Sequence, residues 1–208
     1  MQETREAVPQ PLVVQPAAAD PAVLGLAVFV LGSIVLGLNL VDYVTPGGSV
    51  LAIISAGTGL FLLLVTLWCT RLGQTYLAAV FGIFSAFWLT YSALLLGLGH
   101  NWYGITEAED IFDTIRAFLI AWSILLFFLT VSALRLPVAF PILFGMIDLA
   151  VVIVTVAWLG DAPPNTDLLK VGGYVVFAFA ALGAYAFLGA ASASLGGRGF
   201  PLGAPLVK

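Results

Sequence analysis

From residue 20 onward, long apolar segments alternate with short stretches that are polar or contain proline and glycine. Six segments stand out. Each is long enough for a helix that rises 1.5 Å per residue to cross roughly 30 Å of hydrocarbon, which takes about 20 residues. Lipid offers no partner for bare backbone groups, so each segment is predicted to be helical, and the alternating segments of a membrane barrel are missing. The pattern predicts an all-α, polytopic fold with six transmembrane helices over residues 21–41, 50–69, 75–98, 114–134, 138–159 and 168–195.

Composition agrees with an integral membrane protein and narrows its chemistry. Hydrophobic residues make up 62% of the chain and charged residues 9%, against about 45–50% and about 25% in an ordinary globular domain. The seven basic residues form no patch for nucleic acid, so no such partner is expected. One cysteine, Cys69, and one histidine, His100, offer neither an intrachain disulfide nor a metal site, and no cofactor is expected.

Charges between the segments predict the orientation in the membrane. The basic residues of one side, which the positive-inside rule makes cytoplasmic, are Arg5, Arg71, Arg135, Arg198 and Lys208. The loops of the other side hold Arg116 and Lys170 together with a larger number of acidic residues, namely Asp42, Glu107, Glu109, Asp110, Asp113, Asp161 and Asp167. We therefore expect a multi-pass protein of the cell (inner or plasma) membrane with both termini cytoplasmic. Its parts would be a disordered tail (1–19), a six-helix domain (20–198) and a C-terminal tail (199–208).

Motifs of hydrolases and transferases are missing from the sequence. It contains no GxSxG, no HExxH, no GxxxxGK[ST], and no GxGxxG that opens a helix after a strand. The chain is therefore not expected to be an enzyme, and the pattern favours a protein that moves a solute.

The first apolar segment opens with DPAVLGL, residues 20–26. The carboxylate of Asp20 can accept hydrogen bonds from free backbone N–H groups, and Pro21 fits the first helical turn. A capped helix start is by itself a sufficient explanation of Asp20 and Pro21. A second interpretation is that the partial positive charge of the helix start helps to hold an anion at a cytoplasmic mouth.

Asp148 lies near the middle of the fifth segment. A charged Asp at this depth costs about 2.5–3.5 kcal/mol on insertion scales, so something should compensate it. The spacing puts Asp148 on one helical face with Phe144 and Thr155. Two interpretations remain open, a proton carrier in a symporter and a structural Asp that is hydrogen-bonded to a neighbouring span.

Polar residues near the predicted external ends also allow two interpretations each. Asn39 and Asp42, three residues apart, could line an outer vestibule or lie at the membrane interface. Arg116 follows Asp110 and Asp113, so it could form a local ion pair or capture a substrate carboxylate.

DPAVLGL resembles NPAPLGL, the signature at the start of the first span in the acetate uptake transporter family, a group of six-span carboxylate transporters that includes succinate-acetate permeases. Asp20 replaces the Asn of that signature and Val23 its second Pro. Further stretches are similar to the family in order along the chain, so the resemblance covers nearly everything from residue 20 to residue 203. They are FGIFSAFWLT (81–90), AFLIAWSILLFFLTVSALR (117–135), KVGGYVVFAFAALGAYAFLG (170–189) and GRGFPLG (197–203).

The resemblance implies a solute pathway in each protomer, narrowed by an apolar constriction at Phe29, Phe84 and, in the fifth span, Phe144. Any one of these rings could equally be a helix-packing residue. The signature residues at the start of the first span are Asp20, Pro21, Leu24, Gly25 and Leu26. The candidate substrate or proton contacts are Asn39, Asp42, Trp88, Thr90 and Asp148. The resemblance also implies a homo-oligomer, a hexamer.

These features together predict a membrane transporter or channel for acetate or a similar small monocarboxylate or dicarboxylate, with Asp148 supplying any coupling to protons. The expected partners are the solute, protons and the lipid bilayer. Because the carboxylate of Asp20 is an acceptor only, it would repel an anion unless it were protonated or paired. Two alternatives therefore remain open, a channel for a small neutral solute and a non-transporting membrane scaffold or sensor.

Overall fold

The computed structural model describes residues 19–43, 49–160 and 163–207, and within them it contains six long α-helices and one 3₁₀ turn. All six helices are long and apolar enough to cross a membrane, which confirms the predicted all-α, six-span fold. The predicted disordered tail lies outside the described residues, except for Ala19. The elements are α1 (Pro21–Leu40), α2 (Ser49–Arg71), α3 (Thr75–Gly99), α4 (Ala108–Ser132), η1 (Ala133–Arg135), α5 (Ala139–Leu159) and α6 (Thr166–Ser194).

The start of α4 differs from the prediction. The helix begins at Ala108, whereas the sequence predicted a start at Thr114. Glu109 and Asp110 lie in its first turn, where carboxylates interact favourably with the positive end of the helix dipole. Charges that indicated a loop therefore belong to the helix, because a helix end that projects beyond the lipid can carry them.

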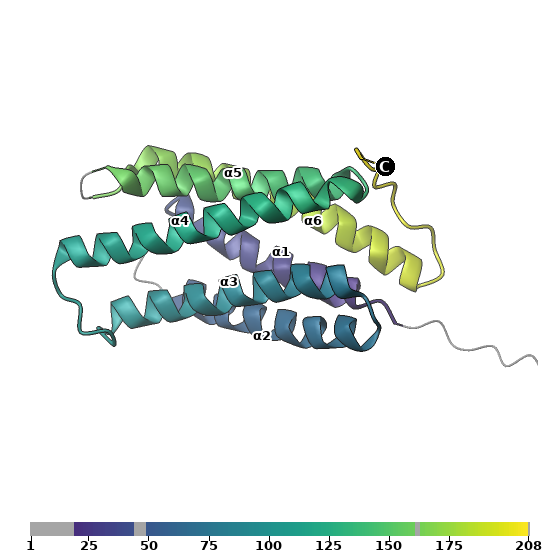
Figure 1. Cartoon of the computed structure of the whole chain (residues 1–208), viewed down its shortest axis with the longest axis horizontal. Helices are drawn as coiled ribbons and strands as arrows, with labels where there is room; N and C mark the ends of the chain where they lie inside the picture. Colours follow the sequence, from purple (N-terminus) through teal and green to yellow (C-terminus); the bar gives the residue numbers. More distant parts are fainter. Residues whose placement is uncertain (1–18, 44–48, 161–162, 208) are drawn as a thin grey trace, which may run out of the picture.

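Consecutive helices run antiparallel and pack as neighbours, except at one seam. Contacts join α1 with α2, α2 with α3, α4 with α5, α5 with α6, and α1 with α6, whereas α3 and α4 meet at few points. Figure 1 shows α2 and α3 on one side, α4 and α5 on the other, and α1 between them. The cavities described below are lined by α3 and α4 together with α1, α5 and α6.

Two glycines of α1 let large rings approach its backbone. A Cβ added at Gly25 would overlap the ring of Phe81 on α3, and one added at Gly37 would lie 2.7 Å from the ring of Phe177 on α6. Small residues allow such close packing between membrane helices, where dispersion replaces the hydrophobic effect as the main attraction. These contacts hold α1 in the centre of the bundle.

The segment predicted as a C-terminal tail lies against the bundle along most of its length. The backbone N–H of Ala139 donates to the carbonyl of Leu202 at 3.0 Å, and the Tyr185 hydroxyl donates to the carbonyl of Pro201, also at 3.0 Å. The ring of Phe200 lies beside Tyr185, with 5.2 Å between ring centroids. This segment therefore connects the start of α5 with the end of α6.

Candidate solute pathway

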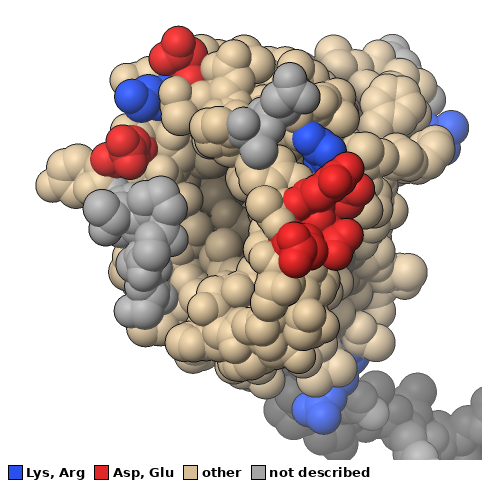
Figure 2. Space-filling view, turned by 90° about the vertical axis from the view of Figure 1, so that its left-hand side faces the viewer, with Lys and Arg blue, Asp and Glu red and all other residues tan. Residues whose placement is uncertain are grey.

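A wide vestibule opens at the end of the bundle where α3 ends and α4 begins. Its volume is about 750 Å³, and its wall combines apolar residues of several helices with a few polar ones. Figure 2 looks onto this end and shows a hollow with acidic side chains on either side. Besides Tyr91 and Trp158, the wall residues with polar side-chain atoms are Asn39, Asp42, His100, Thr166 and Lys170. The structure thus places both Asn39 and Asp42, the predicted vestibule residues, at the mouth.

A second, narrow cavity continues from the vestibule into the bundle. It has a volume of about 60 Å³ and an almost entirely apolar wall. A single water requires a cavity of about 10–15 Å³, so the narrow cavity has room for a few waters or one small solute. The two cavities share five wall residues, so we call the narrow one the neck of the vestibule. The shared residues are Leu40, Tyr91, Phe118, Leu119 and Val154.

Phenylalanines from four helices meet where the neck ends: Phe29, Phe84 and Phe179 line it, whereas Phe144 lies behind them and does not. Phe29 of α1 lies 5.1 Å from Phe84 of α3 and 5.9 Å from Phe179 of α6, measured between ring centroids. Phe144 of α5 lies 6.0 Å from Phe84. All four rings are buried. We call this group the phenylalanine floor.

Phe179 was missed by sequence reasoning. Phe179 belongs to the floor because it lies on the buried face of α6. Gly172, Val176 and Gly183 share this face with it, at three- and four-residue spacing. Gly183 packs on α1, since a Cβ added there would lie 3.1 Å from Val30. The glycine spacing was the signal that could have identified this face, and with it Phe179.

The third span contributes Trp88 to the neck but not Thr90. Trp88 is 2% exposed and lines the neck. Thr90 points away from the bundle and its hydroxyl donates to the carbonyl of Ala86 in the same helix, at 2.7 Å. The structure therefore does not bring Thr90 to the pathway, because it lies on the outer face of α3.

The signature residues begin and pack α1. The Asp20 carboxylate accepts from the N–H of Ala22 at 2.9 Å, which is the predicted cap. Pro21, Gly25 and Leu26 are buried, whereas Leu24 is 36% exposed on the outer face. None of the five lines the vestibule or the neck, so their contacts in the structure are those of a capped and packed helix.

Asp148 lies on the face of α5 that packs against α4. Seven residues further along, the hydroxyl of Thr155 bonds that of Ser123 on α4 at 3.0 Å, and three residues before it, Gly145 faces Thr130 of α4. Asp148 lines neither the vestibule nor the neck. Its Oδ1 atom is buried and has no hydrogen-bond partner among the described residues.

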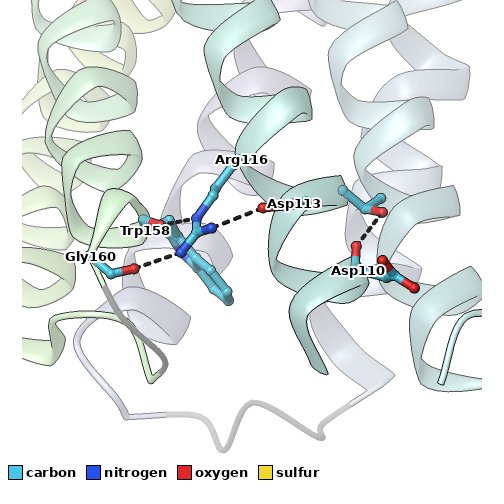
Figure 3. A network of polar contacts seen from close by, with 6 residues as sticks. Asp110, Asp113, Arg116, Trp158 and Gly160 are labelled. Carbon is cyan, nitrogen blue, oxygen red and sulfur yellow. Dashed lines mark hydrogen bonds and ion pairs between the residues drawn. The ribbon is translucent and has the colours of Figure 1, made fainter. Parts of the chain in front are cut away.

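The guanidinium group of Arg116 joins the start of α4 to the end of α5. Its Nε donates to the carbonyl of Trp158 at 2.7 Å and its Nη2 to that of Gly160 at 2.6 Å, while its Nη1 bonds Asp113 at 2.9 Å. Figure 3 shows these three contacts fanning out from one side chain. Of the two interpretations, the structure shows the local ion pair, extended by a cap on the carbonyl end of α5.

A protein-family model matches residues 5–195 of the chain, and it describes the GPR1/FUN34/yaaH family. The chain belongs to this family. Among its relatives, Acetate permease A of Emericella nidulans is 31% identical over 148 residues, which is 66% of this chain and 50% of that protein. The Meiotically up-regulated gene 86 protein of Schizosaccharomyces pombe is 32% identical over 121 residues, 55% of this chain and 38% of that protein.

A third relative, Ammonia transport outward protein 3 of Saccharomyces cerevisiae, is 28% identical over 131 residues, 63% of this chain and 46% of that protein. The chain thus spans at most half the length of these curated relatives. Among solved structures, the bacterial acetate channel SatP superposes with a TM-score of 0.76 at 22% identity, covering 89% of this chain and 99% of that one. These comparisons confirm the family resemblance and the six-helix membrane fold.

Proposed function

We propose that this protein carries acetate or a similarly small carboxylate across a membrane. The observation that carries the proposal is the vestibule that leads into a neck of about 60 Å³ and ends on the phenylalanine floor. A closed apolar constriction of this size admits only small solutes. One relative is named as an acetate permease and a structural neighbour as an acetate channel, which supports the same solute class.

The apolar wall determines the form in which a solute can pass. A hydrated anion that enters the neck loses most of its water, and no cationic side chain lies among the neck residues to compensate it. A constriction of this kind gates by dewetting, so it favours neutral or neutralised solutes over hydrated ions. Passage therefore requires that the acid be protonated, or that the rings of Phe29 and Phe84 move apart while the carboxylate is held by hydrogen bonds.

Flux assays on purified protein test this function. The protein is reconstituted into liposomes that contain unlabelled acetate, and counterflow of labelled acetate is followed at pH 6 and at pH 8. We expect uptake above that of empty liposomes at both values, and faster uptake at pH 6 if the neutral acid is the permeant form. Uptake no faster than in empty liposomes at either pH overturns the proposal.

A second candidate function is passage of a small neutral solute such as ammonia. Acidic side chains lie on either side of the hollow in Figure 2, and the loops at this end hold more acidic than basic residues, which disfavours anions at the entrance. One relative is named for ammonia transport. An ammonium pulse on the same proteoliposomes, with a pH-sensitive dye inside, separates the two functions. Rapid internal alkalinisation together with no acetate counterflow would favour this candidate.

The direction of the pathway is also a proposal. We infer that the vestibule faces the outside and that both termini lie in the cytoplasm, because Arg71, Arg135 and Arg198 lie at the opposite end of the bundle. The solute would then enter near Asn39 and Asp42 and leave near Asp20. The topology is tested with a cysteine introduced at Tyr103 or at Leu206 and a thiol reagent that does not cross the membrane. The native Cys69 is the single cysteine and is buried, so the reagent labels the introduced cysteine alone. Labelling of both positions from the same side of intact cells contradicts this topology.

Assembly as a homo-oligomer, a hexamer by family resemblance, is likewise proposed. Many large apolar side chains of α2 and α4 face outward and would contact either lipid or other subunits. Native mass spectrometry of the detergent-solubilised protein counts the subunits directly, and a monomer at all lipid and detergent conditions contradicts the proposal.

A further inference from the structure

Hydrogen-bonding groups in the wall of the neck are scarce. Only three of its residues carry a polar atom in the side chain, namely Ser33, Trp88 and Tyr91. The hydroxyl of Ser33 donates to the carbonyl of Phe29 at 2.8 Å, so its proton is already used. Free donors in the neck can therefore come only from the indole of Trp88 and the hydroxyl of Tyr91.

Trp88 holds an unused donor at this place. Its side chain is 2% exposed, and its Nε1 atom has no hydrogen-bond partner in the part of the chain that the structure describes. A buried N–H without a partner costs about 1–3 kcal/mol, so native proteins rarely keep one without a use for it. Packing alone does not explain the nitrogen, since Phe would fill much of the same space without an unpaired donor.

The surroundings fix the indole in place. Phe87 meets it edge-on, with 5.2 Å between ring centroids, and Gly32 of α1 leaves space for it, because a Cβ added there would lie 3.1 Å from Trp88 Cζ2. Tyr91 lies one helical turn nearer the vestibule and lines both cavities. Tyr91 and Trp88 thus follow one another along α3, from the vestibule toward the phenylalanine floor.

We infer that Trp88 Nε1, which is fully buried while the phenylalanine floor is closed, becomes the donor to the solute's oxygen when the neck opens, after Tyr91 has met the solute at its entrance. An indole N–H can only donate, and a carboxylate or carbonyl oxygen is the acceptor that matches it. The neck lining offers no carboxylate that would favour a cationic solute. This inference rests on the proposed function and adds to it the side chain that favours oxygen-bearing acids over ammonium, which has no lone pair to accept the hydrogen bond.

The test replaces the nitrogen and keeps the ring. Benzothienylalanine, introduced at position 88 by nonsense suppression, exchanges the N–H for sulfur with nearly the same shape. Loss of a hydrogen bond to a charged or strongly polar oxygen should lower acetate counterflow about tenfold. The melting temperature in detergent should stay unchanged, because the nitrogen has no partner within the described protein to lose. Trp88→Phe gives a second variant that lacks the donor.

The same replacement at Trp122 is the matched control. Trp122 is also an indole packed edge-on against Phe87, at 5.3 Å between centroids, but it does not line the neck. We expect its acetate counterflow to remain at the wild-type rate. Unchanged counterflow in the position-88 isostere, or an equal loss at both positions, overturns the inference and leaves the proposed function standing. If the wild-type protein carries no acetate at all, both the inference and the proposed function are overturned.

Discussion

The rings of Phe29 and Phe84 lie 5.1 Å apart, centroid to centroid, and are tilted by 59° to each other. They come from α1 and α3, two helices that are separated in sequence by the whole of α2. Their contact closes the inner end of the neck, and Phe179 and Phe144 extend it to α6 and α5. The neck ends at this floor in the structure, so a solute on the proposed pathway would have to displace at least one ring.

Removing one ring of the floor should widen the passage. We expect Phe84→Ala to admit longer carboxylates such as butyrate and to raise the acetate leak, because a buried phenyl group is replaced by a methyl. Counterflow of labelled butyrate in proteoliposomes measures this. Phe127→Ala is the control, since Phe127 is 55% exposed on the outside of α4. A lower melting temperature without any change in flux would instead fit a scaffold or sensor.

The contact between Gly25 and Phe81 should be sensitive to volume. Gly25→Ala places a methyl group into the ring of Phe81, so either α1 or that ring must shift. Overpacking of this kind typically costs about 1–3 kcal/mol. Gly57→Ala is the matched control on α2, because nothing lies within 4 Å of the added Cβ. Thermal unfolding in detergent compares the two; equal stability of both variants would contradict the packing described for α1.

Arg116→Ala should destabilise the vestibule rather than remove a substrate contact. The variant leaves the carbonyls of Trp158 and Gly160 without their donors, and hydrogen bonds to charged groups are worth about 1.5–3 kcal/mol each. We expect a lower melting temperature with the acetate concentration for half-maximal counterflow unchanged. Asp113→Asn keeps both carbonyl contacts and should have a smaller effect. A large rise in that concentration at unchanged stability would favour carboxylate capture.

Asp148→Asn separates the two roles predicted for this carboxyl group. A proton carrier needs contact with a water-accessible cavity, and Asp148 lies instead on the α4 side of α5. We therefore expect the ratio of acetate counterflow at pH 6 and pH 8 to remain that of the wild type. A ratio that becomes independent of pH in the Asn variant would establish Asp148 as the coupling residue. Val151→Ala, on the neck face of the same helix, is the control. It shows whether a non-titratable change in α5 also alters the rate of acetate counterflow.

Hydropathy and length alone determined the number of spans and their helical state. The backbone of a segment in lipid must satisfy its own hydrogen bonds, so an apolar stretch of this length has one available structure. The start of α4 was placed too late because acidic residues, which suit the first turn of a helix as well as a loop, carry no signal of their own. Family similarity identified Phe29, Phe84 and Phe144, residues that the structure brings together.

The inward face of each helix was decided only by the tertiary structure. A helix that is apolar all round gives no sign of which side meets its neighbours, so sequence alone could not turn Thr90 outward, Asp148 toward α4 or Phe179 into the floor. Glycines and large rings on facing helices fix these rotations, as Gly25 with Phe81 and Gly37 with Phe177 show. Lipid dictates that the chain forms helices, and the fit of side chains between them dictates where the pathway lies.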